Sequence, residues 1–261
     1  EISMDFTGKN IIVTGGASGI GKAIVTGVVE GGGHAIIVDL NLDAAEKLRE
    51  ELGKDKTSAY KVNLANSAEI REVFGKIVAD FKQIHGLINN AGIVSTVPFD
   101  EVTQAEWDKV IAINLTGAMK VARAALQYFL ANEIKANIVM ITSNAAFESV
   151  TGGPAYCASK AGANALMKSI AFEYGRKGIR CNSICPGPVG TNISESAPDR
   201  NPAGVEVHIK TGYNAHCREW TCMPLGKADD IAPLAVYLAS DESRFMNSAS
   251  IVIDAGVCLS H

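Results

Sequence analysis

The sequence predicts an α/β protein with one doubly wound, seven-stranded parallel sheet and helices on both faces. Short runs rich in β-branched apolar residues alternate with longer segments whose apolar residues recur at the period of a helix. Strands buried on both faces have this composition, and helical crossovers make neighbouring strands parallel. The chain has 261 residues, 47% of them hydrophobic, which is enough for one large core. We therefore expect residues 1–261 to form a single domain.

The expected strands share an apolar, β-branched composition. In chain order they are 10–13, 35–38, 58–62, 86–88, 137–141, 179–184 and 250–253. The expected helices lie between them, at 22–30, 42–52, 67–81, 103–132, 155–176 and 228–238. Helices of this length can return the chain to the start of the next parallel strand by a right-handed crossover.

The alternation stops after residue 186, where a stretch rich in proline, glycine, asparagine and serine begins. Long irregular segments inside a compact domain usually border a ligand. We therefore expect residues 187–224 to form a loop that covers the substrate. No repeat, low-complexity tract or linker indicates a second domain.

Composition narrows the classes of partner and location. The net charge of −4 provides no basic surface for nucleic acid, so a small-molecule substrate is expected. No apolar run reaches the roughly 18 residues that span a bilayer, and residues 1–5 do not resemble a signal peptide, so we expect no membrane partner and a cytoplasmic protein. The six cysteines include no C-x-x-C pair, and His216, Cys217 and Cys222 lack a fourth ligand; no metal is expected.

A glycine-rich turn, Thr-Gly-Gly-Ala-Ser-Gly-Ile-Gly at 14–21, joins the first expected strand to the first helix. Glycine permits positive φ and close approach of a pyrophosphate, and the helix N-terminus offers free N–H groups. Eighteen residues beyond Gly21, Asp39 ends the second strand, where a carboxylate can accept both adenine-ribose hydroxyls and repel a 2′-phosphate. Leu40 and Asn41 supply no arginine, so NAD is favoured over NADP. The alternatives are an ordinary tight turn and a solvated strand-end acid.

Tyr156 and Lys160 lie four residues apart near the start of an expected helix, and therefore on one face of it. A nearby ammonium favours the phenolate, so Lys160 is expected to lower the pKa of Tyr156 and activate it as an acid or base. Taken alone, this spacing more often marks a surface pair.

Several motifs now occur together in order: the turn at 14–21, Asn-Asn-Ala-Gly at 89–92, Asn114, Ser143 thirteen residues before Tyr156, and Pro-Gly at 186–187. Over essentially the whole chain they resemble the short-chain dehydrogenase/reductase family. The resemblance implies a Rossmann-type domain. It also implies an NAD-dependent oxidoreductase that transfers a hydride between nicotinamide and a secondary alcohol or ketone.

The resemblance also implies a role for each of four catalytic residues. Tyr156 exchanges a proton with the substrate oxygen, and Ser143 hydrogen-bonds that oxygen. Lys160 holds the nicotinamide-ribose hydroxyls, and Asn114 positions a water that links Lys160 to solvent. Without the family, Ser143 is a strand-end serine and Asn114 a helix asparagine of no evident purpose.

The residues expected at the NAD site include the glycine turn and the residues after the second to sixth strands. They are Gly15, Ser18, Gly19, Ile20, Gly21, Asp39, Leu40, Asn63, Leu64, Asn90, Ala91, Gly92, Tyr156, Lys160, Pro186, Gly187, Val189 and Thr191. The residues expected at the substrate are Ser95, Ser143, Ala145, Phe147, Tyr156 and Gly187.

The sequence departs from the family pattern at two positions. Asn63 stands where the family often has an aspartate near adenine, and its amide oxygen can still accept a hydrogen bond from the adenine amine. Ala255 stands before Gly256 in the last turn, where the family commonly has two glycines.

Substrate and assembly are less constrained. A small polyol, sugar or hydroxyketone is favoured, the alternative being an NADPH-dependent 3-ketoacyl or steroid-type ketoreductase. A non-catalytic NAD-sensing regulatory protein is the alternative from another class. The resemblance also implies a homo-oligomer, dimer or tetramer, with the helix around 116–119 and the helix after Tyr156 as its interfaces.

Overall fold

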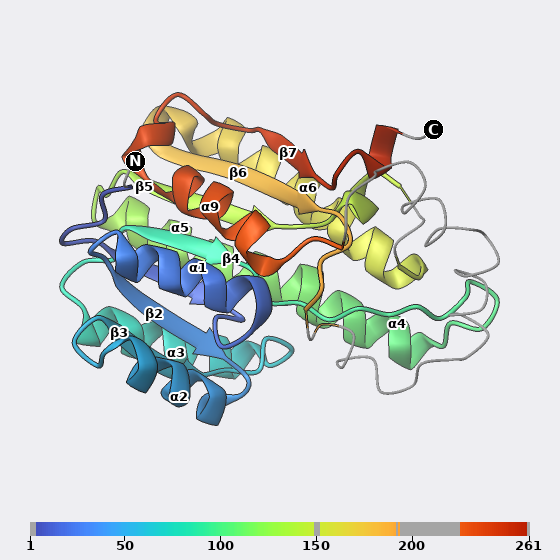
Figure 1. Cartoon of the computed structure of the whole chain (residues 1–261), viewed down its shortest axis with the longest axis horizontal. Helices are drawn as coiled ribbons and strands as arrows, with labels where there is room; N and C mark the ends of the chain where they lie inside the picture. The colour runs from blue at the N-terminus through green and yellow to red at the C-terminus, as the bar shows by residue number, and fades with distance from the viewer. Residues whose placement is uncertain (1–3, 149–151, 192, 194–224, 260–261) are drawn as a thin grey trace.

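The computed structural model describes residues 4–148, 152–191, 193 and 225–259, and Figure 1 shows their arrangement. The strands form one parallel sheet in the order β3-β2-β1-β4-β5-β6-β7. They are β1 (Asn10–Thr14), β2 (His34–Asp39), β3 (Thr57–Lys61), β4 (Gly86–Asn89), β5 (Ala136–Ile141), β6 (Ile179–Pro186) and β7 (Ser250–Ile253). The predicted fold class is confirmed.

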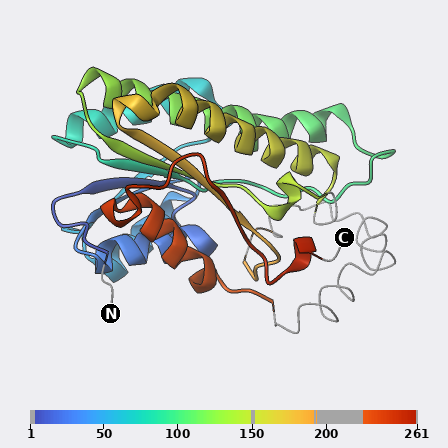
Figure 2. The ribbon, with the colours of Figure 1, turned by 90° about the horizontal axis from the view of Figure 1, so that it is seen from above.

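The main helices are α1 (Gly19–Glu30), α2 (Leu42–Leu52), α3 (Ser67–Asp80), α4 (Gln104–Ile111), α5 (Ala118–Ala131), α6 (Pro154–Tyr174) and α9 (Ala228–Ala239). In Figure 2 they form two layers, with the sheet between them. Helices α1, α2 and α9 bury their apolar residues against one face, and α3, α5 and α6 against the other. Neighbouring strand residues alternate between the two cores; Ile11 faces the first layer and Ile12 the second.

The prediction of one continuous helix over 103–132 was wrong in detail. A π-helical segment, η1 (Ala112–Gly117), separates α4 from α5. At its end Gly117 packs so closely on the chain after β3 that a Cβ there would lie only 2.6 Å from the carbonyl oxygen of Leu64. Apolar periodicity does not reveal one extra residue in a helical turn.

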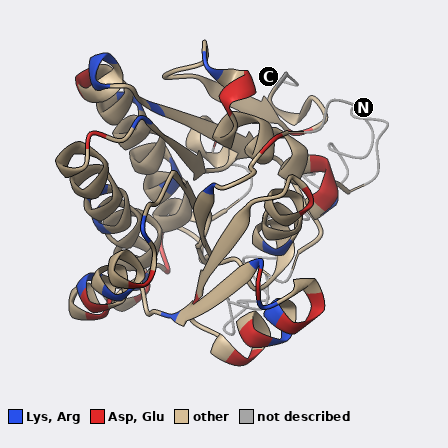
Figure 3. Cartoon of the chain, turned by 90° about the vertical axis from the view of Figure 1, so that its left-hand side faces the viewer, with Lys and Arg blue, Asp and Glu red and all other residues tan. Residues whose placement is uncertain are grey.

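Strand β1 lies between β2 and β4, so the chain order reverses between β1 and β4. In open α/β sheets, ligands bind outside the carboxyl ends of the strands at such a switch point. Figure 3 shows the charged residues mainly on the outer helices, with the sheet largely uncharged. No helix among the described residues is long and apolar enough to cross a membrane.

Candidate active site

The turn after β1 depends on glycine at three positions. Gly15 and Gly19 have φ of +62° and +51°, a region that side chains disfavour. Gly21 has ordinary φ, but a Cβ there would lie 1.9 Å from the carbonyl oxygen of Gly15. The first turn of α1 can therefore pack this closely only with glycine.

Residues after β4 hold this turn in place. The Asn90 amide donates to the carbonyl oxygens of Thr14 and Gly15, each at 3.1 Å. The Thr14 hydroxyl oxygen accepts the backbone N–H groups of Asn90 and Ala91 at 3.0 and 3.1 Å. Asn90 is therefore a structural member of the turn as well as an expected cofactor contact.

Asp39, at the end of β2, is oriented by main-chain donors. One carboxylate oxygen accepts the Ala17 N–H at 3.0 Å and the other accepts the Asn41 N–H at 2.9 Å. Because a carboxylate oxygen can accept more than one hydrogen bond, both oxygens keep capacity for hydroxyl donors.

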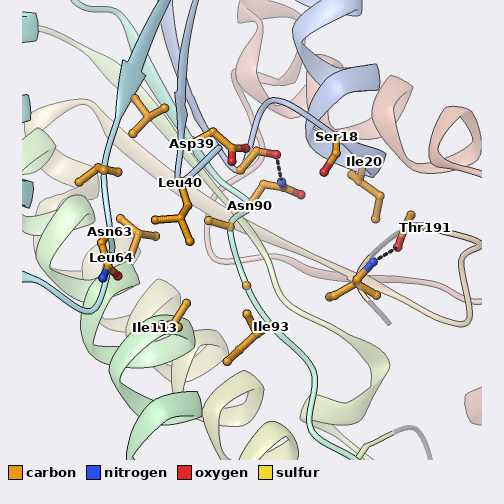
Figure 4. Close-up of a pocket in the computed structure, with 17 residues that line it drawn as sticks. Ser18, Ile20, Asp39, Leu40, Asn63, Leu64, Asn90, Ile93, Ile113 and Thr191 are labelled. Atoms are coloured by element: carbon orange, nitrogen blue, oxygen red, sulfur yellow. Dashed lines mark hydrogen bonds between the residues drawn. The ribbon is translucent and has the colours of Figure 1, made fainter. Parts of the chain in front are cut away.

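A pocket of about 260 Å³ lies at the switch point, beside this turn. Figure 4 shows Ser18, Ile20 and Thr191 at one end of it and Asn63 and Leu64 at the other. The predicted cofactor residues that line it are Gly15, Ser18, Gly19, Ile20, Asp39, Leu40, Asn63, Leu64, Asn90, Ala91, Gly92 and Thr191. Those that do not line it are Gly21, Tyr156, Lys160, Pro186, Gly187 and Val189.

The pocket has an apolar wall that sequence reasoning missed: Val38, Val62, Ile93, Ile113 and Ile193. Val38 and Val62 each precede a predicted contact at the end of a strand. Ile93 follows the Asn-Asn-Ala-Gly motif, so proximity to the motifs was the available signal. Ile113 lies in η1, whose π geometry was not predicted.

Three of the four predicted catalytic residues lie together between β5 and α6. Ser143 lies two residues beyond the end of β5, and Tyr156 and Lys160 lie in the first two turns of α6. All three are buried. The Ser143 side chain lies near enough to the Tyr156 phenol to act on its pKa, and the Lys160 Nζ lies 5.6 Å from the centre of the Tyr156 ring. The i, i+4 spacing therefore does place the phenol and the amine on one face.

Burial dominates the protonation of this group. Desolvation raises the pKa of Tyr156, and the hydrogen bond from Ser143 partly opposes that rise. Desolvation lowers the pKa of Lys160 to about 8, and its Nζ donates to the carbonyl oxygen of Ile141 at 3.2 Å. The expected lowering of the Tyr156 pKa by Lys160 is thus not found in the protein surroundings alone, because burial disfavours both charged forms.

Asn114 lies in η1 and is also buried. Its amide donates to the Ile93 carbonyl oxygen at 2.8 Å and to the Ser159 hydroxyl at 3.2 Å, and its oxygen accepts the Ile93 N–H at 2.9 Å. These bonds connect the chain after β4 to the helix that carries Tyr156 and Lys160. The side chain of Asn114 therefore fixes the position of α6 relative to the chain after β4.

Gly92 lies between the cofactor pocket and the buried catalytic residues. A Cβ on it would lie 3.3 Å from both the Asn114 amide oxygen and the Lys160 Nζ. Gly92 also lines the cofactor pocket. The amine of Lys160 is thus separated from the cofactor pocket by little more than one glycine, which suits a contact with a nicotinamide ribose.

The predicted substrate residues are unequally placed. Ala145 is buried beside Ser143, and Phe147, 51% exposed, lies at the outer end of the same segment. Ser95 is buried, and its carbonyl oxygen accepts the Gly153 N–H at 2.7 Å, so it supports the start of α6. Gly187 packs on Asp254, since a Cβ would lie 2.4 Å from the Asp254 Cβ.

Both departures from the family pattern have a structural counterpart. The Asn63 amide oxygen accepts the Ala65 N–H at 3.0 Å, and Asn63 lines the pocket as expected. Ala255 has φ of +57°, the left-handed conformation for which glycine is suited. An alanine therefore sits in a strained turn after β7.

Much of the predicted substrate loop, residues 192 and 194–224, lies outside the described residues, and with it His216, Cys217 and Cys222. The ends of the loop meet, because Gly190 N–H donates to the Gly226 carbonyl oxygen at 2.8 Å and Gly226 N–H to that of Pro188 at 3.1 Å. Within the described part of the chain, no group of three His, Cys, Asp or Glu side chains could hold a metal ion.

The residues present fit a dinucleotide. The glycine turn leaves room that side chains would fill, and it places the free N–H groups of α1 at the pocket, where a pyrophosphate is stabilised. Asp39 at the end of β2 suits ribose hydroxyls. Lys160 and Tyr156, behind Gly92, mark the end at which a reacting ring would lie.

A family model described as short chain dehydrogenase matches residues 9–202. Over 252 residues the chain is 34% identical to 3beta-hydroxysteroid dehydrogenase 2 of Eggerthella lenta, covering 95% of this chain and 94% of that protein. It is 36% identical over 264 aligned positions to D-threitol dehydrogenase of Mycolicibacterium smegmatis, covering 98% and 96%. The crystal structure of levodione reductase superposes with a TM-score of 0.84 at 27% identity, covering 98% of this chain and 100% of that one.

Proposed function

The chain belongs to the short-chain dehydrogenase/reductase family, and on that premise we propose that it is an NAD-dependent dehydrogenase of small polyols or hydroxyketones. As a family member it is an oxidoreductase that acts on hydroxyl or keto groups with a nicotinamide cofactor. The observation that carries the proposed chemistry is the buried contact between Ser143 and Tyr156, with Lys160 beside the same ring.

The proposed mechanism assigns a proton to Tyr156. In oxidation the phenolate oxygen takes the proton of the substrate hydroxyl, and in reduction the phenol returns it. Ser143 donates to the substrate oxygen while negative charge develops there. Lys160, with its pKa lowered to about 8, exchanges protons readily near neutral pH and holds ribose hydroxyls. When bound, the nicotinamide supplies or accepts the hydride.

Asp39 supports the choice of NAD. Two main-chain N–H groups orient its carboxylate at the pocket, and a fixed negative charge there repels a 2′-phosphate while accepting ribose hydroxyls. This charge also weighs against the NADPH-dependent 3-ketoacyl ketoreductase that remained an alternative.

The substrate class rests on a relative and on polarity. The relative that acts on D-threitol shares 36% identity over nearly the full length of both chains. The hydroxyl of Ser143 and the amide of Asn144 give the site polar groups close to the reacting position. A steroid-type substrate is the second candidate, because the relative named for 3beta-hydroxysteroids shares 34% identity and because Phe147 offers an exposed apolar ring.

A substrate screen tests this proposal. Purified protein is mixed with NAD or NADP and with tetritols, pentitols, simple secondary alcohols and 3β-hydroxysteroids, and NADH or NADPH absorbance is followed. We expect the highest kcat/KM with a small polyol and NAD. Preference for a steroid would replace the substrate class. No turnover with any compound, together with tight NADH binding, would instead favour the non-catalytic sensor.

The cofactor assignment has its own test. Asp39→Ala is expected to weaken NAD binding and to shift the NAD-to-NADP ratio of kcat/KM by at least about tenfold toward NADP, because the repulsion of the 2′-phosphate is removed. An unchanged ratio would exclude this role for Asp39.

We also propose a single catalytic domain that works as a homo-oligomer. Helix α6 is one of the two predicted interfaces, and it presents Phe172 with 90% of its side chain exposed. Contact between α6 and another copy would cover this ring. Light scattering coupled to size-exclusion chromatography tests this, and a monomer at micromolar concentration would contradict it. A cytoplasmic location stays a prediction.

A further inference from the structure

A second hollow adjoins the adenosine end of the cofactor pocket. Its lining residues are Asp39, Leu40, Asn41, Leu42, Asp43 and Lys61. Asp39 and Leu40 line the cofactor pocket as well, so the two spaces adjoin at the end of β2. Whatever projects from the adenosine ribose toward solvent at Asp39 enters this hollow.

Lys61 brings a positive charge to this place from a different strand. It ends β3, and its register partner on β2 is Asp39. Register partners on neighbouring strands project from the same face of the sheet, so the ammonium and the carboxylate share one face. Lys61 is exposed, and it forms no ion pair with any of the described residues.

The other charges of the hollow are acidic. Asp39 is held by the N–H groups of Ala17 and Asn41, and Asp43 lies in the first turn of α2, which Asn41 caps through the Ala44 N–H at 3.1 Å. Two carboxylates thus face one ammonium. With Asp39 intact the hollow is net negative, and without it the charges of Asp43 and Lys61 balance.

We propose that Lys61 is a second determinant of cofactor selectivity, which attracts a ribose 2′-phosphate and so limits the preference for NAD that Asp39 sets. The inference rests on the proposed function, since it assumes that adenosine binds beside Asp39. The residues directly after Asp39, Leu40 and Asn41, carry no positive charge. The sheet register supplies one from β3, more than twenty residues along the chain.

The test uses ligands without nicotinamide. Binding of ADP-ribose and of 2′-phospho-ADP-ribose is measured by calorimetry for wild type, Lys61→Met, Asp39→Asn and the double variant. Asp39→Asn removes the charge and keeps an amide of similar shape. Lys82→Met is the matched control, because Lys82 is exposed and lies before β4, at the opposite end of the sheet.

We expect Lys61→Met to weaken binding of the 2′-phosphorylated ligand about fivefold in the wild-type and Asp39→Asn backgrounds, with ADP-ribose changed less than twofold. The fivefold effect of Lys61→Met on the 2′-phosphorylated ligand should shrink in about 0.5 M salt, because an exposed charge pair is screened. A merely structural role would weaken both ligands equally and would not respond to salt.

The outcomes separate this inference from the proposed function. If ADP-ribose binds and Lys61→Met leaves the ratio of the two affinities unchanged, Lys61 has no part in selectivity and the inference is wrong. If the wild-type chain binds neither ligand, the inference falls together with the proposed cofactor site. An equal effect from Lys82→Met would show only a change of net charge, and would also overturn it.

Discussion

The nucleotide half of the site, around the ends of β1 to β3, is shaped by main chain, whereas the catalytic half, between β5 and α6, is a set of buried side chains. In the first half, positive φ at Gly15 and Gly19 makes the turn, and backbone N–H groups orient the carboxylate of Asp39. In the second, Ser143, Tyr156 and Lys160 are each at least nine-tenths buried. One half depends on conformation and the other on desolvation.

This difference separates the effects that substitutions should have. A change in the nucleotide half disturbs a backbone shape and so affects binding and folding together. A change in the catalytic half removes a titratable group that is costly to bury, so that it can abolish turnover while leaving the fold intact or even stabilised.

The largest expected effect is on turnover. Tyr156→Phe removes the proton-transferring hydroxyl and keeps the ring, so kcat should fall by roughly 10²- to 10⁴-fold. NADH binding, measured by fluorescence, should change less than about threefold, because the nucleotide half is untouched.

The matched control is Tyr174→Phe, at the other end of α6, whose ring would keep its contact with Lys177 at 5.9 Å. Its kcat should match the wild type. If Tyr156→Phe retained most of its activity, another group would have to supply the proton, and the catalytic half would not be the one described.

Lys160→Met should stabilise the chain. Burial depresses the folded-state pKa from 10.5 to about 8, which costs about 3 kcal/mol at pH 7. Because the folded pKa lies below the unfolded one, this cost is full below pH 8 and fades as the pH rises toward 10.5. Urea unfolding should therefore show a gain at pH 7 that shrinks by more than half at pH 9.5.

Lys168→Met, an exposed position on the same helix, should change stability by less than about 0.5 kcal/mol. A gain for Lys160→Met that is equal at both pH values would point to packing, and not to the buried charge. Desolvation of Lys160 would then not be what sets the catalytic half apart from the nucleotide half.

The same contrast explains what the sequence could predict. The strands were placed to within two residues, because alternation of apolar runs is a local pattern. The glycine turn and Asp39 are local too, and they line the pocket together. Burial of Tyr156 and Lys160 depends on packing by β5, β6 and η1, so their pKa directions were beyond the i, i+4 rule. Lys61 beside Asp39 required the register of β2 and β3.

Gly21→Ala should test the main-chain half. Its Cβ would lie 1.9 Å from the Gly15 carbonyl oxygen, so the turn must shift. We expect a loss of about 1–3 kcal/mol in stability and at least about tenfold in ADP-ribose affinity. Gly75→Ala in α3 is the control: a Cβ there has no neighbour within 4 Å, so it should stabilise by about 0.5–1 kcal/mol. If Gly21→Ala and Gly75→Ala changed stability and ADP-ribose affinity equally, the turn after β1 would have no special requirement for glycine.

The smallest expected effect is at the turn after β7, where the family pattern has glycine and this chain has Ala255. Its φ of +57° strains an L-residue, and glycine relieves that strain while adding freedom to the unfolded chain. Ala255→Gly should therefore stabilise by about 0.5 kcal/mol, whereas Ala79→Gly in α3 should destabilise by about 0.5–1 kcal/mol. Both are read from urea midpoints. Destabilisation by both would mean that this turn is not strained. Since Asp254 of this turn packs on Gly187, a rise in KM with Ala255→Gly would further show that the alanine helps to position β6 at the active site.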